Sequence, residues 1–153
     1  MKLAERPATW QPYEPTPGLE SVYLVDIDGT VALKGDRDIY DGSKAHLDTP
    51  NQPVVSIIRR LQADHRIIYM TGRSEEHRHV TTQWINKYRL HHDALHMRPI
   101  GDNRRDDIVK HELFNAHIRG KYNVAAVFDD RDQVVRLWRD MGLTCFQVAD
   151  GNF

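Results

Sequence analysis

Short apolar runs alternate with amphipathic segments along most of the chain. The apolar runs predict buried strands at residues 22–26, 66–70, 94–97, 124–128 and 145–148. Apolar residues at helical spacing predict helices at about residues 53–61, 74–88, 106–117 and 133–141. Alternating strands and helices are typical of an α/β fold in which helices cover both faces of a parallel sheet. We therefore predict a Rossmann-like three-layer sandwich.

The first twenty residues differ from the rest of the chain in composition. They contain four prolines and a glycine, which disfavour a helix or a central strand: Pro7, Pro12, Pro15, Pro17 and Gly18. We predict a proline-rich arm over residues 1–20 and one domain over residues 21–153. Trp10 and Tyr13 are expected to pack the arm on that domain.

Composition and charge narrow the class of protein. Hydrophobic residues make up 40% and charged residues 28% of the 153 residues, as in soluble globular proteins. The formal net charge of −1 gives no overall attraction for nucleic acid, so any basic patch must be local. Cys145 is the only cysteine, which excludes an intrachain disulfide and fits a reducing compartment. Since no apolar run could span a membrane and the first residues lack a signal-peptide core, we expect a cytoplasmic protein without a membrane partner.

Polar side chains follow three of the predicted strands at the point where each strand ends. They are Asp26 and Asp28 at the first strand, Thr71 and Arg73 at the second, and Asp129 and Asp130 at the fourth. Alternation along a strand predicts that Asp26 and Asp28 lie on the same side. A solvated acidic turn would explain any one pair. Ligands of parallel sheets bind at the carboxyl ends of the strands, however, so the convergence favours a functional site.

The residue types at this edge suit phosphoryl transfer. Mg²⁺ prefers carboxylate oxygens, so four aspartates indicate a Mg²⁺ site. Thr71, Arg73 and Lys110 are phosphate binders by type. A carboxylate can also attack phosphorus, provided that a second acid protonates the leaving oxygen and then deprotonates water.

The chain resembles the haloacid dehalogenase-like (HAD) phosphatase superfamily. Four motifs in order carry the resemblance: Asp26-Ile27-Asp28-Gly29-Thr30, Thr71-Gly72-Arg73, Lys110 and Asp129-Asp130. It implies that Asp26 is the nucleophile and that Asp28 is the general acid and base. An aspartate at the position of Asp28 points to phosphoryl transfer to water.

The same resemblance implies the remaining parts of the site. Mg²⁺ would be held by Asp26, the main-chain carbonyl of Asp28 and Asp129, with Asp130 close by. Thr71 and Lys110 would hold the transferring phosphoryl group and neutralise its charge. Thr30 and Gly72, the other polar or glycine positions of the motifs, join the phosphate-binding set.

From about residue 22 to residue 153 the chain resembles, more narrowly, the phosphatase domains of bacteriophage polynucleotide kinase-phosphatases. Residues 105–114, 128–135 and 138–153 carry this resemblance. These domains remove 3′-terminal phosphates from nucleic acid during end repair. The resemblance implies that Arg37 and Arg73 contact phosphate and that Asp106 orients Lys110 or Arg73. It also leaves open that the protein is phage-encoded and acts in the host cytoplasm.

Two features separate the chain from the two-domain phage enzymes. It has no G-x-x-x-x-G-K-[S/T] phosphate-binding loop, so we expect no kinase activity and allow for a separate kinase or ligase as a partner. Predicted helices and strands fill most of the intervals from Thr30 to Thr71 and from Thr71 to Lys110. We therefore expect no separate cap domain. An open site suits a nucleic-acid end better than a sealed metabolite.

Three functions stay open at this point. The leading one is Mg²⁺-dependent removal of a 3′-terminal phosphate from DNA or RNA through an aspartyl-phosphate. The second is a capless phosphatase for nucleotides or phosphoproteins, and the third is a non-catalytic nucleic-acid-binding module. Trp84 and Trp138 lie at core spacing and are expected to pack rather than to stack on bases.

Overall fold

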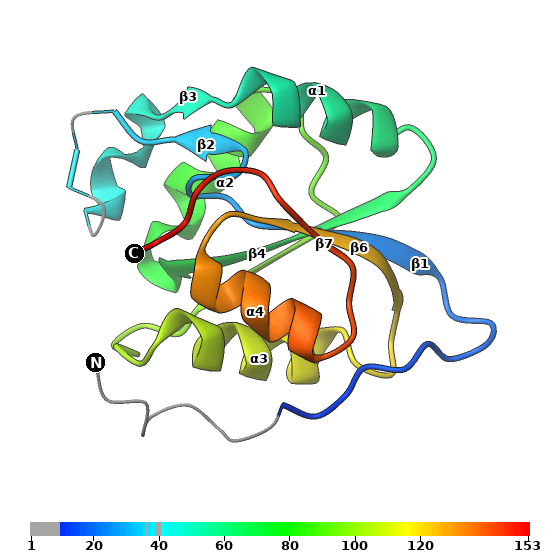
Figure 1. Cartoon of the computed structure of the whole chain (residues 1–153). Coiled ribbons are helices and arrows are strands. Elements are labelled where there is room, and N and C mark those ends of the chain that lie inside the picture. The colour runs from blue at the N-terminus through cyan, green and yellow to red at the C-terminus, as the bar shows by residue number, and fades with distance from the viewer. Residues whose placement is uncertain (1–9, 36, 39–40) are drawn as a thin grey trace.

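The computed structural model of the chain describes residues 10–35, 37–38 and 41–153 and is built around a five-stranded parallel sheet (Figure 1). The strand order is β5-β4-β1-β6-β7. The strands are β1 (Ser21–Val25), β4 (Arg66–Ser74), β5 (Ala94–Arg98), β6 (Asn123–Asp129) and β7 (Cys145–Gln147). All five predicted strands are present. The first nine residues of the predicted arm lie outside the described residues.

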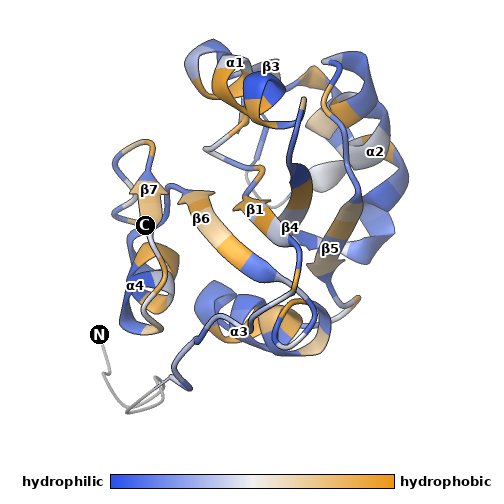
Figure 2. Cartoon of the chain, turned by 90° about the vertical axis from the view of Figure 1, so that its right-hand side faces the viewer, coloured by the Kyte–Doolittle hydropathy of each residue, from blue (hydrophilic) through white to orange (hydrophobic). Residues whose placement is uncertain are grey.

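Helices cover both faces of the sheet, which confirms the predicted three-layer sandwich. In the described part of the chain, α1 (Gln52–Leu61) and α2 (Arg78–Lys87) lie on one face, and α3 (Asp106–His117) and α4 (Asp132–Asp140) lie on the other (Figures 1 and 2). Each pair buries its apolar residues against the sheet. Trp84 on one face and Trp138 on the other are 2% and 1% exposed, so both are packing residues as predicted.

The order of the strands determines where a ligand can bind. From β1 the chain proceeds to β4 and β5 on one side, and then crosses back to β6 and β7 on the other. The helices change face at the same crossing, so β1 lies at a topological switch point. The crevice of such a sheet opens at the carboxyl end of that strand, which here is followed directly by Asp26.

Three local differences from the predicted elements concern this edge. β1 ends at Val25 rather than at Asp26, and β4 continues to Ser74 because Ser74 still pairs with Arg98 of β5. The helix predicted from residue 74 begins as a 3₁₀ turn, η3 (Glu75–His77), whose first turn is capped by the Ser74 hydroxyl.

The interval before α1 holds a small antiparallel pair, β2 (Ala32–Leu33) with β3 (Thr49–Pro50), and the 3₁₀ helix η2 (Gly42–Leu47). No separate cap is present among the described residues.

The described part of the arm packs on the domain as predicted. Trp10 is buried in the cluster beneath α3 and α4, and its ring lies 4.6 Å from that of His111. The Tyr13 hydroxyl accepts a hydrogen bond from the Val124 amide of β6 (2.9 Å), and the Tyr13 amide donates to the Met141 carbonyl (2.8 Å). Among the described residues, no helix has the length and apolarity that crossing a membrane requires.

Candidate active site

The Asp26 side chain is held from two directions at the end of β1. It is 6% exposed, and its two carboxylate oxygens accept hydrogen bonds from the Lys110 ammonium group (2.7 Å) and the Thr30 hydroxyl (3.0 Å). The chain can return Thr30 to Asp26 because it turns sharply after the strand. The amides of Thr30, Val31 and Ala32 all donate to the Ile27 carbonyl. Lys110 arrives from α3, which places the third motif beside the first.

Gly29 allows this turn to approach the end of β6. Its φ of +78° lies in the left-handed region, which side chains disfavour. A Cβ atom at this position would lie only 2.1 Å from a carboxylate oxygen of Asp130. The Thr30 hydroxyl also lies 3.3 Å from the Asp130 carboxylate. Glycine is therefore required both for the backbone conformation and for the contact between the two strand ends.

Three carboxylates meet at the ends of β1 and β6. Oxygens of Asp26, Asp129 and Asp130 lie within 4.8 Å of one another, and all three residues are buried. Lys110 contacts the cluster through Asp26 and through Asp129 (3.1 Å). The indole of Trp138 donates to the same Asp129 oxygen (3.1 Å), and the Asp130 amide donates to the other one (2.9 Å). These donors orient the Asp129 carboxylate toward its neighbours.

Burial and mutual repulsion raise the pKa values of two of these carboxylates, Asp26 and Asp130. Burial, followed by the charge of Asp129, raises the pKa of Asp26 well above its ordinary value. The same two causes raise the pKa of Asp130 to about 6. Burial alone would lower the pKa of Lys110, but the charges of Asp129 and Asp26 outweigh it and raise that pKa. One ammonium group thus faces three carboxylates. The three carboxylates form a donor set that suits a hard divalent cation.

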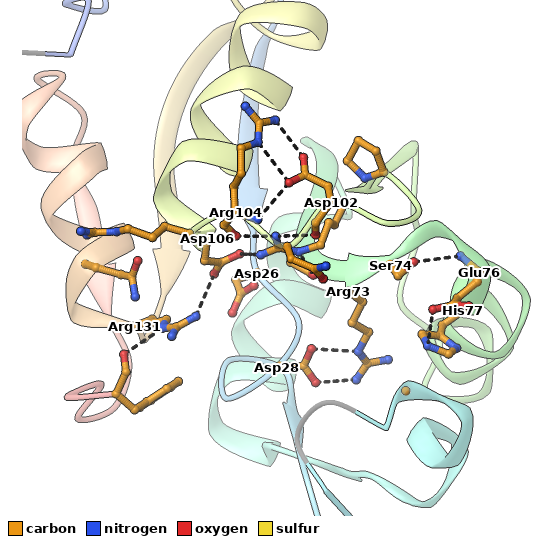
Figure 3. Close-up of a pocket in the computed structure, with 18 of the residues that line it drawn as sticks. Asp26, Asp28, Arg73, Ser74, Glu76, His77, Asp102, Arg104, Asp106 and Arg131 are labelled. Carbon is orange, nitrogen blue, oxygen red and sulfur yellow. Dashed lines mark hydrogen bonds and ion pairs between the residues drawn. The ribbon is translucent and has the colours of Figure 1, made fainter. Parts of the chain in front are cut away.

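The Asp28 carboxylate belongs to a different network from that of Asp26. Arg73 binds both of its oxygens (2.9 and 2.7 Å), and Arg37 binds one of them (3.0 Å). Figure 3 shows the paired contact between Asp28 and Arg73, apart from Asp26. Burial raises the pKa of Asp28, but the hydrogen bonds and charge of Arg73 and the charge of Arg37 outweigh burial and leave this pKa below its ordinary value. The side chain of Asp28 is outside the carboxylate cluster, and its carbonyl as a metal ligand stays a prediction.

Asp48 is a site residue that the sequence did not reveal. Its side chain has no exposed surface and accepts hydrogen bonds from both predicted phosphate binders, Arg37 (2.7 and 2.9 Å) and Arg73 (2.8 Å). Its main-chain carbonyl accepts from the Trp84 indole (2.9 Å). Asp48 precedes β3 in a stretch that carries no motif. Only the three-dimensional contact with two arginines identifies it.

Two predicted phosphate binders at the end of β4 differ in position. Thr71 is fully buried, and its hydroxyl accepts from the Arg73 amide (3.1 Å). Gly72 instead lines the pocket, and a Cβ atom there would lie 2.2 Å from an Asp106 oxygen. The Gly72 carbonyl accepts from Arg98 (2.7 Å), a second residue that the sequence did not single out.

Asp106 lies with Lys110 and not with Arg73. At the first turn of α3, its carboxylate is 4.0 Å from the Lys110 ammonium group, 3.3 Å from Arg98 and 3.8 Å from Arg131. The predicted alternatives were Lys110 and Arg73. Arg73 has Asp28, Asp48 and Thr81 as its side-chain partners, so the geometry favours Lys110.

A cavity of about 580 Å³ opens over these groups, large enough for a nucleotide. Its lining includes Asp26, Asp28, Arg37, Arg73, Asp106, Asp129 and Asp130, which brings most of the predicted site residues to one place. Figure 3 shows Arg131 at one side of this pocket and Glu76 and His77 at the other. Of the rim arginines, Arg104 is bound by Asp102 and Glu112, and Arg105 is bound by Asp107.

Comparison with known proteins shows the family to which the chain belongs. The model of the family described as polynucleotide kinase PNKP phosphatase domain matches residues 20–153. A protein of Autographa californica nuclear polyhedrosis virus, provisionally named bifunctional polynucleotide kinase/RNA ligase, is 43% identical over 131 residues. That match covers 82% of this chain and 19% of the viral protein.

Solved structures show the same likeness. A chain in "Structure of the Pnkp1/Rnl/Hen1 RNA repair complex" superposes with a TM-score of 0.90 at 36% identity, covering 97% of this chain and 48% of the other. A chain in "Structure of Pnkp1/Rnl/Hen1 complex" gives a TM-score of 0.89 at 36% identity, covering 97% and 52%. The chain thus spans about a fifth of the viral relative and about half of these two chains. It belongs to the family of polynucleotide kinase PNKP phosphatase domains, with the HAD-like fold.

Proposed function

We propose that the chain is a Mg²⁺-dependent phosphomonoesterase that removes the 3′-terminal phosphate from nucleic-acid ends, RNA ends above all. The observation that carries the proposal is Asp26, a buried carboxylate held by Lys110 and Thr30 at the floor of a nucleotide-sized pocket. The family supports phosphatase chemistry. The names of the relatives, a kinase/RNA ligase and an RNA repair complex, support RNA ends as substrate and a separate ligase as a partner.

The chemistry follows from the two carboxylates of the first motif. In the first step, an Asp26 oxygen forms a bond to phosphorus, the bond from phosphorus to the 3′ oxygen breaks, and Asp28 gives its proton to that oxygen. In the second step, Asp28 takes a proton from water. The water oxygen then bonds to phosphorus while the bond to Asp26 breaks, and inorganic phosphate leaves.

The arginines regulate the proton on Asp28. In the substrate-free protein, Arg37 and Arg73 hold Asp28 in its ionised form, which suits the second step. The first step requires the protonated form. Incoming phosphate competes with Asp28 for these arginines, and its negative charge offsets theirs. Asp28 then loses the interactions that lowered its pKa, so this pKa rises toward that of a general acid.

The carboxylate cluster fits the metal that this chemistry uses. Asp26, Asp129, Asp130 and the Asp28 carbonyl would hold Mg²⁺, which would neutralise charge on the phosphoryl oxygens. Lys110 supplies a positive charge to Asp26 and Asp129 in addition to that of the ion. The Trp138 indole and the Asp130 amide keep Asp129 oriented for the ion.

A phosphate-release panel tests the function. We expect the highest kcat/KM on 3′-phosphorylated RNA or DNA oligonucleotides, with lower values on 5′-phosphorylated oligonucleotides, mononucleotides and phosphopeptides. EDTA should abolish release, and added Mg²⁺ should restore it. Folded protein that releases no phosphate from 3′ ends would contradict the proposal. Faster turnover of mononucleotides or phosphopeptides would instead favour the capless phosphatase.

Mg²⁺ should also stabilise the fold in a pH-dependent way. The raised pKa values of Asp26 and Asp130 favour metal-free folding at low pH, and this stability is lost as pH rises through about 6, the pKa of Asp130. Mg²⁺ binds the ionised carboxylates, so we expect millimolar Mg²⁺ to raise the Tm more at roughly pH 8 than at roughly pH 5. Thermal melts with and without EDTA measure this. Asp129→Asn is the control, and an equal shift at both pH values would count against the site.

A further inference from the structure

Phe153 is an exposed aromatic residue at the rim of the candidate active site. Its side chain is 56% exposed, yet it lines the same pocket as Asp26 and Asp28. The other large apolar residues that are exposed in the described part of the chain lie outside that lining: Leu33, Leu47, Ile57, Ile100 and Phe146. Among these exposed apolar side chains of the described residues, Phe153 is therefore the one that a ligand in the pocket would meet.

The main chain around Phe153 is tied to the turn that carries Asp130. Gly151 packs so closely on this turn that a Cβ atom would lie 1.9 Å from the Asp130 carbonyl oxygen. The Gly151 carbonyl accepts from the amides of Asp132 and Phe153, both at 2.9 Å. The main chain of Phe153 therefore has a defined place relative to the carboxylate cluster.

Arg131 holds the ring from one side and links it to the phosphate-facing part of the pocket. Its Nε donates to the Phe153 carbonyl (2.8 Å), and its guanidinium group lies 5.2 Å from the ring centroid. The same side chain reaches Asp106, which lies 3.8 Å away (Figure 3). An aromatic ring with a cation on one side lies beside a pocket that suits phosphate. Together they offer contacts for both the base and the phosphate of a nucleotide.

We infer that Phe153 stacks on the base of the terminal nucleotide while the 3′-phosphate of that nucleotide lies at Asp26. The inference rests on the proposed function and adds to it a specificity-determining residue. Stacking accepts any base, because every base presents a π-face. Phe153 would thus select a nucleotide over other phosphomonoesters without selecting a sequence.

A substrate-variant cycle tests the inference. The wild type and Phe153→Ala are compared on a 3′-phosphorylated oligonucleotide and on the same oligonucleotide with an abasic terminal residue. We expect wild-type kcat/KM to be about 5- to 100-fold higher with the base present, mainly through KM. In Phe153→Ala this preference should shrink to less than about twofold, and Phe153→Trp should restore it.

Phe146→Ala is the matched control. Phe146 on β7 is 51% exposed and contacts Phe128, but it lies outside the pocket lining, so the preference for the base should persist in this variant. A Phe153→Ala enzyme that keeps the full preference for the base would overturn the inference but not the proposed function. Equal losses of kcat/KM on both substrates would do the same, because they indicate a structural or docking role. A wild type that releases no phosphate from either substrate would overturn the proposed function and the inference together.

Discussion

Replacing Asp26 with asparagine is expected to lower phosphate release from a 3′-phosphorylated oligonucleotide by about 10³- to 10⁴-fold. The amide has nearly the shape of the carboxylate. Its oxygen can still accept a hydrogen bond from Lys110, and its NH₂ group can donate to the Thr30 hydroxyl. It cannot attack phosphorus, and it removes one charge from the carboxylate cluster. The expected loss is in kcat, because the interaction with phosphorus exists only along the reaction path.

Stability distinguishes loss of the nucleophile from loss of the fold. Burial and the charge of Asp129 already disfavour the ionised form of Asp26, as its raised pKa indicates, and asparagine resembles the neutral form. Without Mg²⁺ at neutral pH, Asp26→Asn should therefore melt at the wild-type temperature or above it. Asp64→Asn, at an exposed aspartate paired with His65, is the matched control and should keep full activity. Full activity in Asp26→Asn would exclude the aspartyl-phosphate mechanism.

The architecture was predictable because its signals are local. Apolar runs and helical spacing predicted every strand of the main sheet and every α-helix in the described part of the chain, and α3 begins and ends at the predicted residues. The errors occurred where tertiary contacts override local pattern. β4 continues past Met70 because β5 offers it further pairing at Arg98. β1 stops before Asp26, where the chain enters the turn in which the Ile27 carbonyl accepts from the amides of residues 30–32.

The site residues likewise differ in whether local sequence pattern predicts them. Asp26, Lys110 and Asp129 follow from motifs whose order the topology converts into proximity. Strand alternation predicted that Asp26 and Asp28 lie on the same side. Both line the pocket, but their carboxylates have different hydrogen-bond partners.

Other supporting residues have no local signal at all. Asp48 contacts Arg73 from 25 positions away. Trp138 fits a core position by its spacing, and nothing in that spacing reveals the hydrogen bond from its indole to Asp129. Such residues act through side-chain geometry that only the packed fold determines.

Replacing Asp48 with alanine is expected to lower the free energy of unfolding by about 3–5 kcal/mol, the typical cost of breaking a buried ion pair. Asp48 accepts three hydrogen bonds from Arg37 and Arg73, whose side chains are only 2% and 5% exposed. Without Asp48, Asp28 alone remains to balance both guanidinium groups among these contacts, and it is partly exposed. Chemical denaturation at neutral pH measures the change. Asp48→Asn, which keeps an acceptor but loses the charge, should lie between alanine and the wild type.

The exposed ion pair of Glu20 with Arg66 provides the comparison, and Glu20→Ala should change stability far less. Asp48→Ala should also weaken phosphate release in the surviving folded protein, because Arg37 and Arg73 lose the group that positions them against Asp28 and incoming phosphate. That effect should appear in KM at temperatures well below the melting transition, and the KM of Glu20→Ala should match the wild type. A variant as stable as the wild type would show that the other contacts of the two arginines suffice to hold them. Asp48 would then be a neighbour of the site and not part of its support.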